Sequence, residues 1–212
     1  MLNSYLTVKG EGESEMVVQK SRFIAHVKRT TTEEEAQAFI QHIKKNHNNA
    51  THNCSAYLIG EQDNIQKAND DGEPSGTAGV PMLEVLKKKQ LKDTTVVVTR
   101  YFGGIKLGAG GLIRAYGQTV SEGINATGIV ERKLMTKIQT NIDYTLLGKV
   151  ENEIRSSNYI LKEINYLDNV QVIVIVERGE EETFIEWITN LTSGKGTVSV
   201  HNQLYIEVDV PS

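Results

Sequence analysis

The chain has 212 residues, of which 39% are hydrophobic and 24% charged, so its composition is that of a globular protein large enough to bury a core. Its net charge of −4 argues against a general polyanion binder, and no apolar run approaches the roughly 18 residues needed to cross a bilayer. The start, MLNSYLTVKGEG, lacks the features of a signal peptide, and the single Cys54 excludes an internal disulfide. We therefore expect a cytoplasmic protein without a membrane partner.

The first residues predict strands followed by a capped helix. Residues 5–30 mix Val, Ile and Phe without a helical period, which favours strands. Residues 32–48 predict a helix, because Thr32 and Glu35 have the spacing of a capping box. Its expected apolar face consists of Ala36, Phe39, Ile40 and Ile43.

The middle of the chain alternates polar and buried segments. Residues 52–60 predict a short strand, 65–79 a polar loop, and the segment after it a helix through about Lys89, with Pro81 in its first turn. Residues 94–102, TTVVVTRYF, are apolar on both faces, which predicts a central strand. The next helix should end at Gly128, and its apolar positions are Leu112, Ile113, Tyr116, Val120 and Ile124.

The last 80 residues repeat strand and helix patterns in a different order. The expected elements are a strand at 133–144, a helix at 145–158, two strands within 159–177, a helix at 179–194, and a final strand or hairpin at 196–210. This βαββαβ order is the ferredoxin-like pattern. We predict an α+β protein with domains at 1–130 and 131–212. The charge changes near this boundary, from a net +1 over residues 1–132 to −5 over 133–212.

The stretch RYFGGIKLGAGGLIRAYG, residues 100–117, holds six of the 18 glycines. A strand precedes it and a helix follows, and no Ser, Thr or Asp stands just before Leu112 to cap that helix. Free N–H groups and a partial positive charge at such a helix start suit a phosphate or carboxylate. The predicted phosphate or nucleic-acid ligands are Arg100, Gly103, Gly104, Lys106, Gly108, Gly110, Gly111 and Arg114.

Two alternatives qualify this interpretation. The stretch fits neither a Walker loop nor a G-x-G-x-x-G motif, and its glycines also suit a tight turn and close helix–sheet packing. Residues 87–114 carry a local net charge of +6, yet lysines 87–89 are also what the solvated end of a helix would present.

A second unusual segment, NDDGEPSGTAG, spans residues 69–79. Clustered carboxylates could hold Mg²⁺ or act as a general base, whereas the structural alternative is a solvated turn ending in a helix cap. The residues of this possible second site are Asp70, Asp71, Glu73, Ser75 and Thr77, of which either Ser75 or Thr77 could be the cap. We favour the structural alternative and predict no metal ion and no cofactor.

His52 and Cys54 share one face of a predicted strand, which is a spacing that a nucleophile and its base could use. A lone strand cysteine is more typically a small buried residue, so we predict no catalytic residue here. The histidines are scattered without zinc-ligand spacing.

The residues above resemble the signature of the IMPACT/YigZ family over the whole chain. The signature is matched by Gly79, Met82, Leu83, Leu86, Leu91, Val97, Val98, Arg100, Tyr101, Phe102, Gly103, Gly104, Leu107 and Gly108, and DDGEPSGTAG is a further hallmark. The resemblance implies an N-terminal domain similar to domain 2 of ribosomal protein S5. It also implies a small C-terminal domain similar to the last domain of elongation factor G.

The resemblance also suggests functions. The eukaryotic IMPACT protein regulates translation through an extra N-terminal domain, and the domain pair resembles elongation-factor domains that contact the ribosome. We therefore expect a non-enzymatic protein that binds RNA or the ribosome and acts in translation control. The alternatives are an enzyme acting on a phosphorylated small molecule, because some kinases of this fold hold phosphate in a glycine-rich loop, and a protein-interaction module.

Overall fold

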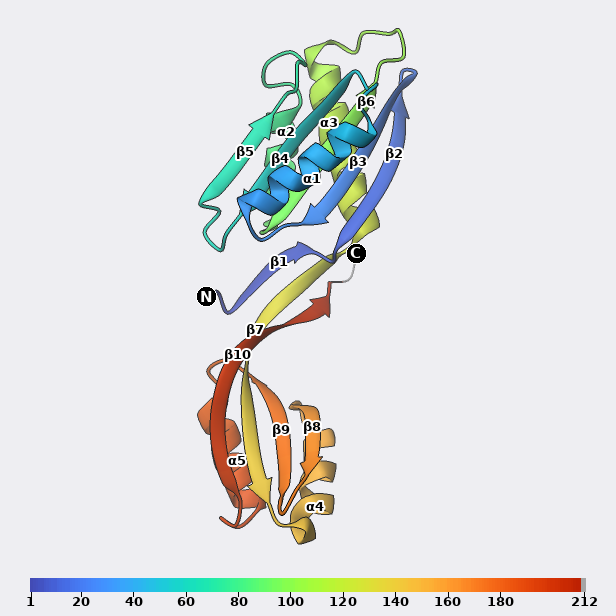
Figure 1. Cartoon of the computed structure of the whole chain (residues 1–212). Helices are drawn as coiled ribbons and strands as arrows, with labels where there is room; N and C mark the ends of the chain where they lie inside the picture. Colours follow the sequence, from blue (N-terminus) through green and yellow to red (C-terminus); the bar gives the residue numbers. More distant parts are fainter. Residues whose placement is uncertain (211–212) are drawn as a thin grey trace. The chain divides into compact units, whose positions relative to one another are not determined.

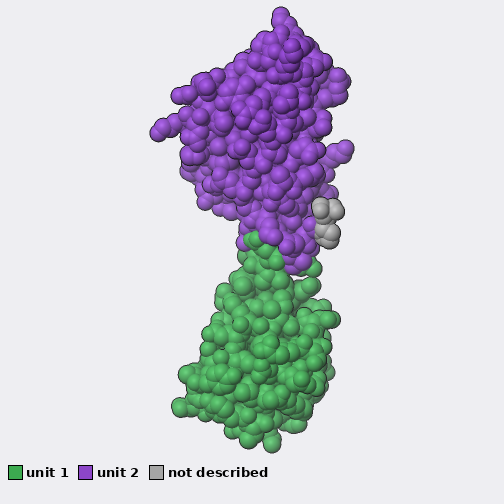
Figure 2. Space-filling model, turned by 90° about the vertical axis from the view of Figure 1, so that its right-hand side faces the viewer, with its two compact units in different colours: residues 1–4, 133–207 green, residues 5–132, 208–212 purple. Residues whose placement is uncertain are grey.

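The computed structural model describes residues 1–210 and divides the chain into two compact units (Figure 2). The larger unit contains Tyr5–Arg132 and the residues from Val208 on, and the smaller unit contains Met1–Ser4 and Lys133–Glu207. The chain crosses between the units three times, each time inside a strand, namely β1 (Ser4–Val8), β7 (Ile129–Ile142) and β10 (Thr197–Asp209). The expected division at residue 130 thus differs from this one mainly at the termini, where each short end segment joins the other unit.

The larger unit is built on a five-stranded antiparallel sheet in the order β2-β3-β6-β4-β5. Its strands are β2 (Glu11–Val18), β3 (Ser21–Arg29), β4 (His52–Ile59), β5 (Ile65–Asn69) and β6 (Thr94–Tyr101). The predicted central position of residues 94–102 is confirmed, because β6 lies in the middle and is buried on both faces.

Helices cover both faces of this sheet (Figure 1). The helix α1 (Glu33–Asn46) packs on one face against Tyr57, Ile59 and Val97. The helices α2 (Gly79–Lys88) and α3 (Gly108–Thr127) pack on the other face and form the larger core.

The start of α1 confirms its predicted cap. The Thr32 hydroxyl accepts a hydrogen bond from the Glu35 N–H, and the Glu35 carboxylate in turn accepts one from the Thr31 N–H. The predicted apolar face of Ala36, Phe39, Ile40 and Ile43 is buried. Local pattern was sufficient here because cap and stripe are both short-range features.

Two expectations for the larger unit were wrong. The predicted polar loop at 65–79 begins with the edge strand β5, whose exposed side chains carry no apolar alternation that would reveal a strand. Ile113 of α3 is 43% exposed, whereas Leu112, Tyr116, Val120 and Ile124 are buried. These four positions already supply the stripe that faces the sheet, so Ile113 lies beside the contact.

The smaller unit has the predicted βαββαβ order. After β7 come α4 (Tyr144–Arg155), β8 (Ile160–Tyr166), β9 (Val170–Glu177), α5 (Glu181–Leu191) and β10 (Thr197–Asp209). The strand β7 lies beside β9 and also pairs with β10 and with β1 (Ser4–Val8), and β8 is at the edge. Both helices bury apolar residues in one core, so the protein is α+β with two sheets.

No helix within residues 1–210 is long and apolar enough to cross a membrane.

Candidate nucleic-acid-binding surface

Three loops meet at one end of the larger unit (Figure 1). These three end loops are the β2–β3 turn at 18–21, the acidic loop at 70–78 and the glycine loop at 102–108. The Ser21 hydroxyl accepts a hydrogen bond from the Gly103 N–H at 3.2 Å, which joins the turn to the glycine loop. The β2–β3 turn and the glycine loop therefore form neighbouring parts of one surface.

A buried ion pair connects the acidic loop to the strand that leads into the glycine loop. Arg100 Nη1 lies 2.6 Å from Glu73 Oε1, and the two residues are only 5% and 7% exposed. The Tyr116 hydroxyl of α3 donates to the same carboxylate oxygen at 2.8 Å. Removing one partner of such a pair typically costs about 3–5 kcal/mol, because it leaves the other charge buried and uncompensated.

Arg100 is thus buried and does not occupy the exposed position that the sequence predicts for a phosphate ligand. Its guanidinium is 5.3 Å from the ring centroid of Phe23 and 5.5 Å from that of Phe102. The planar cation is enclosed by aromatic rings and a carboxylate, which is an arrangement that fixes it in place.

Cys54 and His52 lie beside this pair and have structural partners. The buried Cys54 thiol donates to the carbonyl oxygen of Asp70 at 3.0 Å, and burial raises the pKa of the thiol to about 12. His52 Nδ1 donates to the carbonyl oxygen of Asp71 at 2.8 Å. A thiol with so high a pKa is a poor nucleophile, and the prediction that Cys54 is a small buried residue is confirmed.

Asp70 caps α2, a role that the sequence had suggested for Ser75 or Thr77. Its carboxylate accepts from the N–H groups of Gly76, Ala78 and Gly79 at 2.8, 3.1 and 2.8 Å. Burial alone would raise the pKa of Asp70, but these three donors outweigh it and the pKa is lowered. Ser75 is exposed, and the Thr77 hydroxyl instead donates to the carbonyl of Pro74 at 2.6 Å.

The other acids of this loop are also engaged within the fold. Asp71 accepts from Lys44 Nζ at 2.6 Å and from the Asn53 N–H at 2.7 Å, while Glu73 pairs with Arg100. Among residues 1–210 no cluster of three or more His, Cys, Asp or Glu is arranged to hold a metal ion. The carboxylates of the acidic loop therefore bind groups of α1, β4, β6 and the start of α2 within the fold.

The first turn of α3 differs from that of α2. No side chain caps α3, as the sequence predicted, but α3 begins at Gly108 with Leu107 at its N-cap position, four residues before the expected start at Leu112. Residues 108–110 are exposed, so the free N–H groups at this helix start face an open surface. Here the structure retains the feature on which the predicted anion site depends.

The predicted glycines have different reasons for lacking a side chain. A Cβ at Gly103 would fall 2.0 Å from the backbone of Lys20, so close packing of two loops excludes any other residue. Gly104 and Gly108 have φ values of +85° and +68°, which only glycine adopts readily. A Cβ at Gly111 would be 3.1 Å from Leu107 Cβ, whereas one at Gly110 would meet only Arg114, at 3.6 Å.

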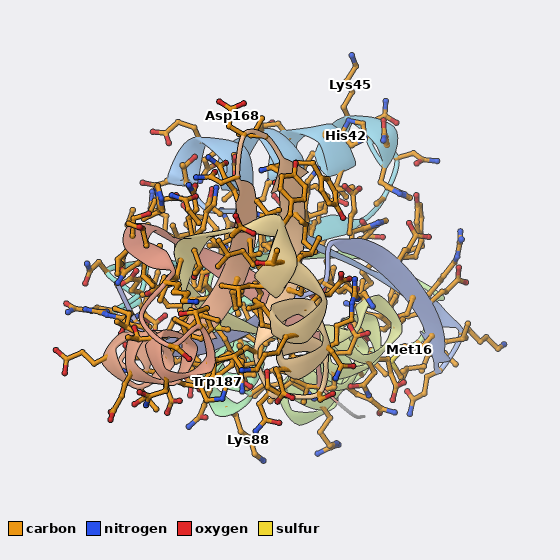
Figure 3. All side chains as sticks on the ribbon, turned by 90° about the horizontal axis from the view of Figure 1, so that it is seen from below. Met16, His42, Lys45, Lys88, Asp168 and Trp187 are labelled. Carbon is orange, nitrogen blue, oxygen red and sulfur yellow. The ribbon has the colours of Figure 1, made fainter. Side chains whose placement is uncertain are left out.

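The cations of residues 87–114 do not form one patch. Lys92 pairs with Asp63, Lys87 pairs with Glu84, and Lys88 points away from the protein at the end of α2 (Figure 3). Lys89 contacts Asn125, which lies eleven residues beyond Arg114 in α3 and hence about 16 Å along the helix axis. Secondary structure disperses charges that are neighbours in sequence.

Three exposed cations remain at the end loops. Lys106 and Arg114 belong to the glycine loop and to α3, and Lys20 belongs to the adjoining turn. Within the described part of the chain none of the three makes an ion pair or a side-chain hydrogen bond. Lys20 is a ligand candidate that the sequence did not reveal, because it is 86 residues away from Lys106 along the chain.

Comparison with known proteins identifies the family of this chain. The Impact N-terminal domain matches residues 19–124, which include all three end loops except one residue, and a domain of unknown function, DUF1949, matches residues 140–195. The IMPACT family member YvyE of Bacillus subtilis is 66% identical over 207 residues, covering 98% of this chain and 95% of that protein. The chain belongs to the IMPACT family.

Another IMPACT family protein and a solved structure are also similar to this chain. The family member YigZ of Escherichia coli is 37% identical over 151 residues, covering 67% of this chain and 74% of that protein. A crystal structure described as a hypothetical protein superposes with a TM-score of 0.61 and 28% identity, covering 95% of this chain and 99% of the other. The predicted membership in the family is thus confirmed, and it extends to both domains.

Proposed function

We propose that this IMPACT family protein binds RNA or the ribosome through the three end loops of its larger unit and acts in the regulation of translation. The observation that carries the proposal is the exposed, uncapped and glycine-lined start of α3, with Lys106 and Arg114 beside it. A phosphate at this position would accept hydrogen bonds from backbone N–H groups and be attracted by the helix dipole.

The exposure of the glycine loop and of the start of α3 favours a macromolecular anion over a small substrate as the ligand. An enzyme acting on a phosphorylated molecule would need free acidic groups or a closed pocket, yet Asp70, Asp71 and Glu73 are all engaged within the fold. Two clefts of about 530 and 260 Å³ in this unit are lined by residues of α1, β2 and β3 rather than by the glycine loop. A nucleic acid can instead lie across an open surface and be bound through its phosphates.

Salt dependence tests this proposal. Each neutralised phosphate releases counterions, so log affinity falls with log salt by about 0.7 for each contact to a single strand. If Lys20, Lys106 and Arg114 each neutralise one phosphate, we expect a slope of about −2. Binding of a labelled RNA and of purified ribosomes would be measured by titration at several salt concentrations.

Matched variants make the test specific. The double variant Lys106→Ala/Arg114→Ala should reduce the magnitude of the slope by about 1.4. The control Lys162→Ala/Lys195→Ala removes two exposed cations from the smaller unit and should leave binding unchanged. Equal binding by the wild type and the Lys106/Arg114 double variant would refute the proposal, whereas absence of RNA and ribosome binding at low salt would favour a protein partner.

A further inference from the structure

An exposed aromatic ring lies at the same surface. Phe102 is 45% exposed at the start of the glycine loop, although a phenylalanine of a folded domain is usually buried. Ile105 and Ile113, which are 41% and 43% exposed, lie in the same loop and in the first turns of α3. The surface that presents Lys106 and Arg114 thus also presents apolar side chains.

Contacts with buried and neighbouring residues of the fold fix the backbone and the ring of Phe102. The Phe102 N–H donates to the Thr51 hydroxyl at 3.0 Å, and the next N–H, that of Gly103, donates to Ser21. The buried Arg100 guanidinium lies 5.5 Å from the ring centroid and is itself fixed by Glu73. A ring supported in this way loses little conformational entropy when a ligand packs on it.

A second observation is a hydrogen-bond donor next to Phe102 that has no partner within residues 1–210. The Nε–H of Arg100 is buried and has no hydrogen-bond partner among the described residues. Buried donors are nearly always satisfied in folded proteins, so an unpaired one beneath a binding surface points to an ordered water at this position.

We infer that the ligand of this surface is single-stranded RNA and that Phe102 is the platform on which one of its bases stacks. The inference rests on the proposed function and adds the class of nucleic acid. In a duplex both faces of each internal base are covered by neighbouring base pairs, so an exposed aromatic ring can be used only by an unstacked base. Aromatic rings combined with cations are the usual means of binding single strands without sequence preference.

The phosphates and the bases of the RNA should contact different parts of this surface. Phosphates are attracted to the start of α3, Lys106 and Arg114, where no acidic side chain occurs between residues 94 and 121. The base packs against Phe102, and Ile105 and Ile113 border it with apolar surface. Such a surface binds any sequence, because every base offers a π face.

The test compares a fluorescein-labelled 12-nucleotide RNA with the same strand in a 12-base-pair duplex. The wild type should bind the single strand more tightly than the duplex. Phe102→Ala should weaken single-strand binding about 5- to 150-fold, which is the range for loss of one stacked base. It should leave duplex binding and the salt slope unchanged, since no cation is lost. Phe102→Trp should retain single-strand binding. The control Ile160→Ala removes a 42% exposed apolar side chain from the smaller unit and should leave binding unchanged.

The outcomes separate this inference from the proposed function. Two outcomes refute stacking while salt-dependent RNA binding stands. In one, Phe102→Ala weakens single-strand and duplex binding equally, and in the other it weakens neither. If the wild type binds neither form of RNA but binds vesicles of anionic lipid, both the proposed function and the inference are refuted. A thermal melt of Phe102→Ala that matches the wild type establishes that the variant is folded.

Discussion

At the scale of the residue, Gly110 is the glycine among the predicted phosphate ligands that the fold itself does not require. It lies in the first turn of α3, and a Cβ there would meet only the Arg114 side chain. Gly103 differs, because a Cβ at that position would collide with the backbone of Lys20. A change at Gly110 can therefore separate anion binding from folding.

We predict that Gly110→Asp weakens RNA binding without loss of stability. A carboxylate at the start of a helix interacts favourably with its dipole, which should raise the free energy of unfolding by about 0.3–1 kcal/mol. The same charge repels a phosphate, and like-charge contacts at interfaces cost several kcal/mol, so the affinity should fall at least about tenfold. Urea denaturation and RNA titration measure the two effects.

The uncharged variant Gly110→Asn is the control for size. It should retain most of the RNA affinity, since it adds a similar side chain without the charge. If the Asn and Asp variants lost affinity equally, steric blocking would explain the loss and the anion site would not be supported.

At the scale of the element, α2 and α3 begin at the same end of the larger unit with opposite arrangements. The N–H groups at the start of α2 are satisfied by Asp70, whereas those of α3 have no side-chain cap. An acid from the chain itself thus occupies one helix start, and the other remains available to an anion from outside.

We predict that Asp70→Ala lowers the free energy of unfolding by about 0.5–2 kcal/mol, which is the range for loss of a helix cap. The cause is that three N–H groups near the start of α2 lose their acceptor. Urea denaturation is the measurement, and Ser75→Ala should leave stability nearly unchanged, because Ser75 is exposed. A larger loss in the Ser75 variant than in the Asp70 variant would contradict the assignment of the cap.

At the scale of the whole molecule, stability should depend on pH through several buried or hydrogen-bonded groups. Burial lowers the pKa of His26, although Glu13, 2.9 Å away, partly offsets this and His47 adds to it. The pKa of Glu35 is lowered chiefly by the Thr31 N–H, and that of Glu181 chiefly by the Thr136 hydroxyl.

All three shifts have the same sign. A folded-state pKa below that of the unfolded chain means that folding is favoured when the group is deprotonated. The contribution of His26 should therefore be present above its unfolded pKa of about 6.5 and be lost as pH falls below it. The carboxylates should lose theirs below about pH 4.

We predict that the unfolding midpoint in urea falls in two steps as pH is lowered from 8 to 3. His26→Gln should abolish the first step and retain the second, whereas His201→Gln, a change at an exposed histidine, should leave both. An unchanged pH profile for the His26 variant would show that this imidazole is not the titrating group.

The sequence by itself determined the features that depend on neighbouring residues. The cap at Thr32, the apolar stripe of α1, the buried strand at 94–101 and the uncapped start of α3 follow from spacing within a few residues. The family signature is likewise carried by residue order. The local pattern did not predict the edge strand β5, because an exposed strand need not alternate apolar and polar residues.

Only the tertiary structure decided which cations are available to a ligand. The order of strands in the sheet brings Arg100 to Glu73, 27 residues away in sequence, and removes this cation from the surface. The helices carry lysines 87–89 away from the glycine loop, and the β2–β3 turn brings Lys20 to it. Packing of the α3 stripe likewise left Ile113 exposed. These outcomes depend on which elements pair and pack, and periodicity along the chain holds no information about partners so distant in sequence.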